Sequence, residues 1–385
     1  MAKIITMFNH KGGVSKTTTV FNLGWMLARM GKRVVMVDAD PQCNLTGVVL
    51  GLNPVWPSNY AEEESASPSE YEADAKEADE AFARSQERSE RVWMDIENKS
   101  LFEALRPAFE AEPRLMEPAD CIPVEGRDGL FLLPGSLRLG EFDVTLSIAS
   151  ELSSSLMSFR NVPGAMNYLL RQTAEALDVD YVLVDLNPSL GSLNQNLVCI
   201  SDLLIVPTAP DYFSLMALRS LAQVLPKWMN WAHRASENEI LKNASYPFPK
   251  PSLTFAGVVI QRFRLYRAPS DEELYGIPSR PFQVWIQKME QEIAEGFIPS
   301  MKRMGILAEE SDYVQAGIPD SKVLAKIQEF NSLLPRSQEC RVPVYELTDD
   351  QLDQVGVVLA GSKRQIKSLY RIFEEFANRV ISLSE

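Results

Sequence analysis

The first forty residues alternate short, largely apolar runs with a stretch whose apolar residues recur every three to four positions. Ile4–Phe8 and Val34–Asp38 are runs of the first kind, and such continuous runs predict strands that are buried on both faces of a parallel sheet. Between them, Thr17–Met30 carries apolar residues at helical spacing. Two strands around one helix predict a βαβ unit.

The same alternation returns further along the chain. It predicts two helices and three strands, namely Pro163–Leu177, Leu215–Leu225, Tyr181–Asp185, Leu203–Pro207 and Ala256–Ile260. Strands that alternate with helices predict an α/β fold, here a mostly parallel, doubly wound sheet flanked by helices, with ligands at the carboxyl ends of its strands. We expect residues 1–385 to form a single domain.

One acidic insertion, Asn53–Lys99, interrupts this alternation. From Ala61 to Ser100 the chain has thirteen acidic residues and five basic ones, so more than half of its net charge of −14 lies there. The alanine- and glutamate-rich run Tyr71–Arg91 predicts an exposed helix. The insertion is either a solvated segment without chemistry or a docking surface for a partner.

Composition excludes several classes of protein. With 38 basic and 52 acidic residues, the chain is not a general polycation, so any contact with DNA has to use a local patch. The four cysteines and two histidines are scattered along the chain, which argues against a disulfide framework or a zinc site. These residues are Cys43, Cys121, Cys199, Cys340, His10 and His233. The sequence has neither a signal-peptide core nor the roughly twenty apolar residues of a membrane span. We therefore expect a cytoplasmic protein with no membrane partner.

The strongest motif is Lys11–Thr18, which lies between a predicted strand and the start of a predicted helix. Backbone N–H groups of such a turn, with a helix N-terminus behind them, form a cradle for a polyphosphate. Lys16 is expected to reach the β- and γ-phosphates, and Thr17 to bind Mg²⁺. Measured against the pattern G-x-x-x-x-G-K-S/T, both glycines are replaced, by His10 and Ser15, and a second lysine, Lys11, is added.

This second lysine carries a family resemblance. Lys11–Thr18 resembles the deviant Walker A box of the ParA/MinD superfamily of P-loop ATPases. Val34–Thr46 resembles the Walker A′ and switch I stretch of that superfamily, and Tyr181–Gly191 resembles its Walker B and switch II stretch. Gln315–Pro319 also resembles a segment found in ParA-like chains. The Asp40-Pro41-Gln42 sequence favours partition ATPases of the ParA/Soj type over MinD.

The resemblance implies specific roles for residues of this chain. It implies a homodimer that sandwiches two ATP molecules, in which Lys11 reaches the phosphates bound by the other subunit and stabilises charge during phosphoryl transfer. Asp40 would position the attacking water, and Asp38 and Asp185 would act in the Mg²⁺ shell through water. Thr17 would bind Mg²⁺ directly. The nucleotide would be held by Lys11, Gly12, Gly13, Val14, Ser15, Lys16, Thr17, Thr18 and Pro319.

Basic residues near the C-terminus are the clearest candidates for DNA contacts. At about 100° per residue, four of them fall within one arc of a helix of roughly 100°, and they are Lys363, Arg364, Lys367 and Arg371. Apolar residues from Ile366 to Val380 occupy another arc. Arg262, Arg264 and Arg267 form a second basic group. These side chains either bind DNA phosphates without sequence preference or only keep a surface helix solvated.

Four functions remain open at this point. The first is a partition or positioning ATPase that binds non-specific DNA and is released when an activating adaptor protein stimulates slow hydrolysis. The second, a MinD-like membrane positioner, needs a basic amphipathic C-terminal tail, whereas this chain ends Ile381–Glu385. The third, a cluster carrier of the nitrogenase iron protein type, needs a cysteine pair. The fourth is an ATP-switched assembly subunit that works through the acidic insertion.

Overall fold

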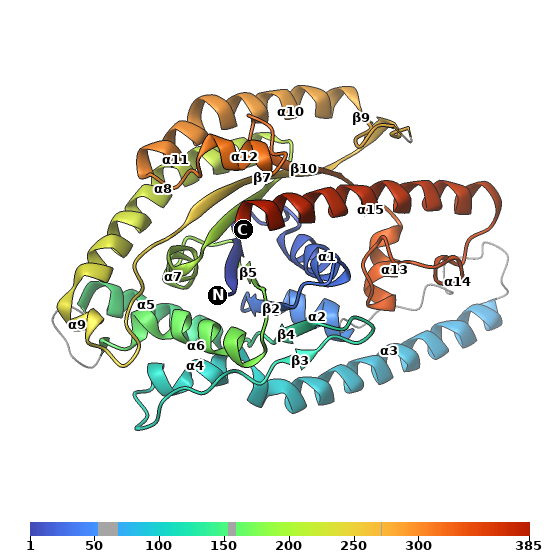
Figure 1. The fold of residues 1–385 in the computed structure, drawn as a ribbon. Helices are drawn as coiled ribbons and strands as arrows, with labels where there is room; N and C mark the ends of the chain where they lie inside the picture. The colour runs from blue at the N-terminus through green and yellow to red at the C-terminus, as the bar shows by residue number, and fades with distance from the viewer. Residues whose placement is uncertain (53–67, 153–158, 271) are drawn as a thin grey trace.

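The computed structural model describes residues 1–52, 68–152, 159–270 and 272–385. Its centre is one sheet with the strand order β10-β7-β6-β1-β5-β2-β4-β3 (Figure 1). All neighbouring strands run parallel except β3 and β4, so the predicted fold class is confirmed. The strands are β1 (Lys3–Met7), β2 (Val34–Ala39), β3 (Ile122–Pro123), β4 (Leu130–Leu133), β5 (Tyr181–Leu186), β6 (Leu203–Thr208), β7 (Thr254–Phe263) and β10 (Val323–Gln328).

Helices cover both faces of the sheet, because its central strands have side chains buried on each side. In β1, Ile4 belongs to the core on one face and Ile5 to the core on the other. The Ile5 face packs against α1 (Lys16–Arg29), α2 (Asn44–Leu50), α12 (Glu310–Gln315) and α15 (Gly356–Ser384). The Ile4 face packs against α4 (Leu101–Phe109), α5 (Leu139–Leu152), α6 (Val162–Ala176), α7 (Ser192–Ile200), α8 (Tyr212–Glu237), α10 (Arg280–Glu292) and α11 (Ile298–Met304).

The remaining elements are short or peripheral. A π-helical turn, Ile293–Phe297, joins α10 to α11. A two-stranded ribbon follows β7 and lies beyond the sheet. The ribbon consists of β8 (Leu265–Arg267) and β9 (Ile277–Pro278). The short helices are α9 (Glu239–Lys242), α13 (Leu333–Cys340) and α14 (Asp349–Leu352).

One predicted helix is much longer in the structure. The predicted Leu215–Leu225 is only part of α8, which continues past Pro226 to Glu237. Proline usually ends a helix, and the prediction stops before it. The apolar stripe nevertheless continues through Trp228 and Met229, which are buried in the core, and this burial keeps the chain helical.

The acidic insertion contains the predicted helix. Tyr71–Arg91 lies within α3 (Pro68–Ile96), which runs along one side of the molecule and leads through the 3-10 turn Glu97–Lys99 into α4 (Figure 1). Residues 53–67 of the insertion lie outside the described residues. In the ranges that the structure describes, no helix has both the length and the apolar character needed to cross a bilayer.

Candidate nucleotide site

The phosphate loop joins the central strand β1 to α1 and contains two residues with left-handed backbone. Gly13 has φ 70° and Ser15, the residue before α1, has φ 54°. Glycine adopts this conformation freely, whereas a residue with a Cβ is strained there by roughly 1–2 kcal/mol. The backbone therefore explains why an ordinary P-loop has glycine where this chain has Ser15.

Lys16 begins α1 and is directed back over the loop. Its side chain is buried, and its Nζ donates hydrogen bonds to the carbonyl oxygens of Asn9 at 3.0 Å and Lys11 at 3.4 Å. Burial lowers the pKa of Lys16, while the carboxylates of Asp185 and Asp40 act in the opposite direction. A buried ammonium at a helix N-terminus is suited to bind an anion.

A cavity of about 280 Å³ lies in front of this loop. All residues from Gly12 to Thr18 line it, and so do Asp40 and Pro188. The structure thus brings together the predicted phosphate-binding residues Gly12–Thr18, which include the predicted magnesium ligand Thr17, and the predicted water-positioning carboxylate of Asp40. These residues come from the carboxyl ends of three adjacent strands, β1, β2 and β5.

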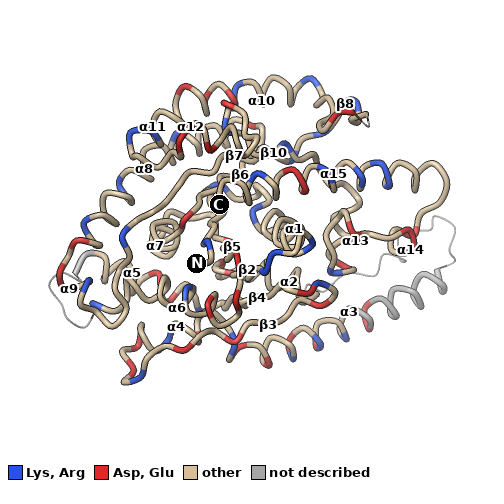
Figure 2. The backbone as a smooth tube through the Cα atoms, viewed as in Figure 1, with Lys and Arg blue, Asp and Glu red and all other residues tan. Residues whose placement is uncertain are grey.

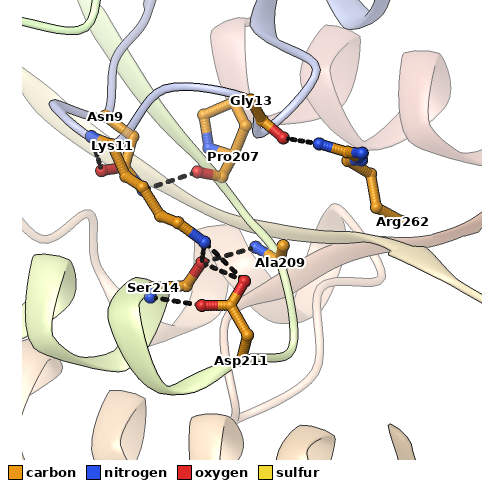
Figure 3. Close-up of polar contacts among 8 residues, drawn as sticks. All are labelled: Asn9, Lys11, Gly13, Pro207, Ala209, Asp211, Ser214 and Arg262. Atoms are coloured by element: carbon orange, nitrogen blue, oxygen red, sulfur yellow. Dashed lines mark hydrogen bonds and ion pairs between the residues drawn. The ribbon is translucent and has the colours of Figure 1, made fainter.

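Lys11 is held by the beginning of α8 (Figure 3). Its Nζ donates to the carboxylate of Asp211 at 2.5 Å and to Ser214 Oγ at 2.9 Å. Asp211 also caps α8, because its Oδ1 accepts a hydrogen bond from the Ser214 N–H at 2.9 Å. Burial alone would raise the pKa of Asp211, but the hydrogen bonds from Lys11 and Ser214 outweigh it and hold the pKa below its usual range.

Sequence reasoning missed Asp211. A sequence signal was available, because Asp before a helix is a common N-cap, but only the sheet order shows that it lies beside Lys11. β6 pairs with β1, so the residues after β6 meet those after β1.

Asp38 is fully buried at the end of β2 and organises the turn after it. Its Oδ2 accepts hydrogen bonds from the backbone N–H and the hydroxyl of Thr46 at 2.8 and 2.7 Å. Its Oδ1 accepts one from the Asp40 N–H at 3.2 Å. Burial raises the pKa of Asp38 to about 6. These contacts position Asp40, and the role of Asp38 in a magnesium shell stays a prediction.

Asp185 pairs directly with Asp38 in the β2–β5 register. It is fully buried, and the Thr17 hydroxyl beside it favours its charged form. Burial, together with the like charge of Asp38, outweighs the Thr17 hydroxyl and the Lys16 ammonium and raises the pKa of Asp185 to about 8. A buried carboxylate beside a second one is stabilised by a cation, so the residues present fit a Mg²⁺ ion near Thr17.

The outer wall of the loop comes from the end of β7. Arg262 has left-handed backbone with φ 65°, and its Nη1 donates a hydrogen bond to the carbonyl oxygen of Gly13 (Figure 3). Gln261 is buried and donates to the carbonyl of Val14 at 2.5 Å. Arg262, predicted as a DNA contact, is therefore placed on the phosphate loop.

A second cavity of about 300 Å³ continues from the loop between the ends of β7 and β10. It extends from Ser15 and Thr18 to Phe330 and Asn331. Sequence reasoning missed Phe330 and Asn331, since no motif marks them.

Pro319 is not brought into the site. It lies before the amino end of β10, is exposed, and lines neither cavity. β10 runs parallel to β7, so the residues that follow β10 face the phosphate loop in place of those before it. We therefore correct the expectation that Pro319 contacts nucleotide.

Four of the other predicted DNA contacts gather in one groove of about 850 Å³, which we call the basic groove. The predicted residues that line it come from the end of β7 and from α15, and they are Arg264, Arg364, Lys367 and Arg371. Figure 2 shows basic residues along the N-terminal half of α15. Lys363 does not line the groove, and its Nζ pairs with Asp349 at 2.8 Å. On the opposite side of α15, Leu369, Phe373, Phe376 and Val380 are buried as predicted.

A phosphate-binding loop between the central strand of a parallel sheet and the following helix defines a P-loop nucleotide-binding protein. The family model of the AAA domain (AAA_31) matches residues 2–235, more than half of the chain. The chain belongs to this family, and its resemblance to the ParA/MinD superfamily of P-loop ATPases, nearest to the partition ATPases, is confirmed.

Two relatives have described roles. The sporulation initiation inhibitor protein Soj of Bacillus subtilis is 28% identical over 225 residues, which are 57% of this chain and 64% of that protein. The chromosome partitioning protein ParA of Caulobacter vibrioides is 26% identical over 233 residues, which are 58% of this chain and 62% of that protein. The match therefore spans less than two-thirds of either relative.

A solved structure shows the fold independently. Protein DIP2308 of Corynebacterium diphtheriae matches with a TM-score of 0.56 at 20% identity, and the match covers 88% of this chain and 97% of that one.

Proposed function

We propose that this chain is an ATPase that forms an ATP-dependent sandwich dimer, binds DNA without sequence preference, and partitions or positions DNA or another cargo. Its hydrolysis is slow and is stimulated by an adaptor protein. The observation that carries this proposal is the shared cavity of the phosphate loop and Asp40, with Lys11 beside it. ParA/MinD relatives with P-loops are generally ATPases.

Hydrolysis needs a positioned water and a stabilised leaving group. Asp40 orients the water whose oxygen attacks the γ-phosphorus, while the bond from that phosphorus to the β–γ bridging oxygen breaks. Lys16 and the N–H groups of the loop stabilise the charge on the β- and γ-phosphates. Thr17 and Asp185 would hold a Mg²⁺ ion, which would supply further charge neutralisation. Lys11 of a second copy adds a positive charge in trans.

Exposed apolar side chains shortly after three strands support the dimer. Leu137, Leu190 and Phe213 are 77%, 42% and 72% exposed. They follow β4, β5 and β6, whose carboxyl ends all lie at the edge of the sheet that holds the phosphate loop. Large apolar side chains exposed along one edge of a sheet are typical of an interaction surface. A second copy that covers this edge would bring its own Lys11 to the bound phosphates.

The basic groove supports binding to DNA. Its four cations come from two separate elements that the fold brings together, in a chain whose net charge is −14. Such a local concentration of positive charge suits the sequence-independent phosphate backbone. A dimer presents the groove twice, which strengthens binding through avidity.

The deciding experiment measures binding of an arbitrary duplex DNA to the full chain with ATP and Mg²⁺ at low and high salt. We expect salt-sensitive binding that is lost in the Arg364→Glu and Lys367→Glu double variant, with unchanged ATP affinity. Lys16→Ala should lose both ATP and DNA binding, because dimerisation depends on the nucleotide. The control Lys302→Ala changes an exposed lysine at the end of α11.

Two results would contradict the DNA role. One is equal DNA affinity in the double variant, and the other is no DNA binding by the parent protein at low salt with ATP. Either result, with ATP binding intact, would favour an ATP-switched assembly subunit that uses the acidic insertion as its docking surface.

A further inference from the structure

One glycine after β5 lies against a carboxylate from a different helix. Gly191 precedes α7 and has extended backbone, with φ −71° and ψ 170°, which any residue can adopt. A Cβ at this position would nevertheless lie 2.7 and 2.9 Å from the two carboxylate oxygens of Asp143. Position 191 is therefore glycine for reasons of space and not of conformational freedom, and an acidic side chain of α5 takes that space.

Asp143 supplies the N-cap that Gly191 cannot. The first N–H groups of a helix have no partner within the helix, and a side-chain oxygen of the preceding residue often accepts a hydrogen bond from one of them. Gly191 has no side chain, and Asp143 Oδ1 accepts from the Leu193 N–H at 2.7 Å instead. The carboxylate also places a negative charge at the positive end of the α7 dipole. The start of α7 is thus fixed by a residue of α5.

The start of α7 in turn holds the turn between β5 and α7, residues 187–191. Asn194 lies in the first turn of α7 and is fully buried. Its Nδ2 donates hydrogen bonds to the carbonyl oxygens of Asn187 at 3.0 Å and Ser189 at 2.8 Å. These two residues flank Pro188, so the position of α7 determines where the Pro188 ring lies.

Pro188 forms part of the wall of the cavity in front of the phosphate loop. It lines this cavity together with Asp40, and a Cβ at Gly12 would lie 3.7 Å from Pro188 Cγ. In the proposed site, Lys16 and the loop N–H groups bind the phosphates, whereas the water that Asp40 orients has to fit within the cavity. A small displacement of Pro188 therefore affects hydrolysis more than it affects nucleotide binding.

Resting on the proposed function, we propose that Asp143 is a positioning residue for ATP hydrolysis. By capping α7 it holds the 187–191 turn, and Pro188 with it, in the arrangement in which the attacking water is aligned. Asp143 does not itself line the cavity, so it acts only through α7.

The test measures steady-state ATP hydrolysis by the full chain with Mg²⁺. Asp143→Ala should lower kcat by about threefold to thirtyfold, the range that loss of an N-cap allows, with unchanged ATP affinity. Asp143→Asn should retain the parental kcat, because an asparagine oxygen caps a helix as well as an aspartate oxygen does. Gly191→Ala should lower kcat as Asp143→Ala does, since its Cβ displaces the carboxylate. The double variant should be no slower than the slower single variant, because both changes break one contact.

Hydrogen–deuterium exchange of peptides from residues 187–200, measured without nucleotide, gives a second readout that does not depend on catalysis. Asp143→Ala and Gly191→Ala should exchange faster there, and Asp143→Asn should exchange as the parent does. The matched control is Glu141→Ala, which removes an acidic side chain from the same helix. Glu141 pairs with Arg138 at 3.0 Å, so this variant should match the parent protein in both measurements.

A parental kcat in Asp143→Ala, with hydrolysis by the parent protein intact, would overturn the positioning role and leave the proposed function in place. An equal loss of kcat in Asp143→Asn would also overturn it, and so would additive losses in the double variant. No ATP hydrolysis by the parent protein would instead overturn the proposed function, and the positioning role with it.

Discussion

Lys11 and Asp211 form an ion pair within one chain, with 2.5 Å between Lys11 Nζ and Asp211 Oδ2. The two residues are 200 positions apart and meet because β1 and β6 are neighbours in the sheet. The same carboxylate group caps α8. The lysine proposed to serve a second subunit is therefore bound by its own chain, and this contact has to break before Lys11 can act in trans.

Asp211→Asn should strengthen ATP-dependent dimerisation. Asparagine retains an oxygen that can cap α8, but it lacks the charge that holds Lys11. An ion pair that is partly exposed, as this one is, contributes about 0.2–1 kcal/mol, so half-maximal dimer formation should need roughly twofold to fivefold less ATP. Analytical ultracentrifugation at increasing ATP measures this. Asp211→Ala, which also loses the cap, is the comparison, and weaker dimerisation of Asp211→Asn would contradict the competition.

Lys11→Ala should bind ATP with near-parental affinity and yet fail to hydrolyse it or to form a stable dimer. Lys16 and the loop N–H groups hold the phosphates within one chain, whereas the charge of Lys11 is proposed to serve the other. Nucleotide affinity, turnover and sedimentation are measured together. Normal turnover by a normal dimer would exclude the trans role.

Asp40→Ala should bind ATP and dimerise but lose turnover, because Asp40 orients water and does not hold the nucleotide. Loss of a positioning group of this kind lowers the rate by about 10²–10⁴-fold. Single-turnover hydrolysis of preformed dimers is the measurement, and Asp128→Ala, at a position that does not line the cavity, is the control. A hydrolysis rate equal to that of the parent protein would show that another group orients the water.

Ser15→Gly should stabilise the protein. Removing the Cβ relieves about 1–2 kcal/mol of left-handed backbone strain, and the greater freedom of glycine in the unfolded chain offsets about 0.5–1 kcal/mol of this. The remaining gain predicts a rise in Tm of about 1–2 °C. Thermal unfolding without nucleotide measures it, with Ser15→Ala as the variant that keeps the strain. A lower Tm for Ser15→Gly would show that the hydroxyl contributes more than the strain.

Asp185→Asn should raise the Tm more at pH 8.5 than at pH 5. The folded pKa of Asp185 is raised to about 8 from an ordinary 3.8, so between these values the folded chain binds more protons than the unfolded one. Its contribution to stability therefore falls as the pH rises through this range and is constant above it. Asparagine does not ionise, so the variant does not lose this contribution to stability as the pH rises. Melting in EDTA at both pH values is the measurement, and an equal shift at both would contradict the raised pKa.

The order of strands and helices was determined by the sequence itself, because apolar periodicity is a local property. The runs around β1, β2, β5, β6 and β7 and the motif Lys11–Thr18 predicted the parallel sheet and the phosphate loop. The basic and apolar arcs of α15 were also predictable. In each case the physical cause, such as burial on both faces or a glycine turn before a helix, lies within a few consecutive residues.

Contacts between distant segments were decided only by the tertiary structure. The sequence does not state which strand lies next to β1, so it could not place Asp211 on Lys11 or Arg262 on Gly13. It also could not show that Pro319 lies at the amino end of β10, away from the phosphate loop. Phe330 and Asn331 follow the carboxyl end of β10 and lie on the side of that loop. Strand order and direction bring separate loops to one edge of the sheet, and no local pattern encodes that order.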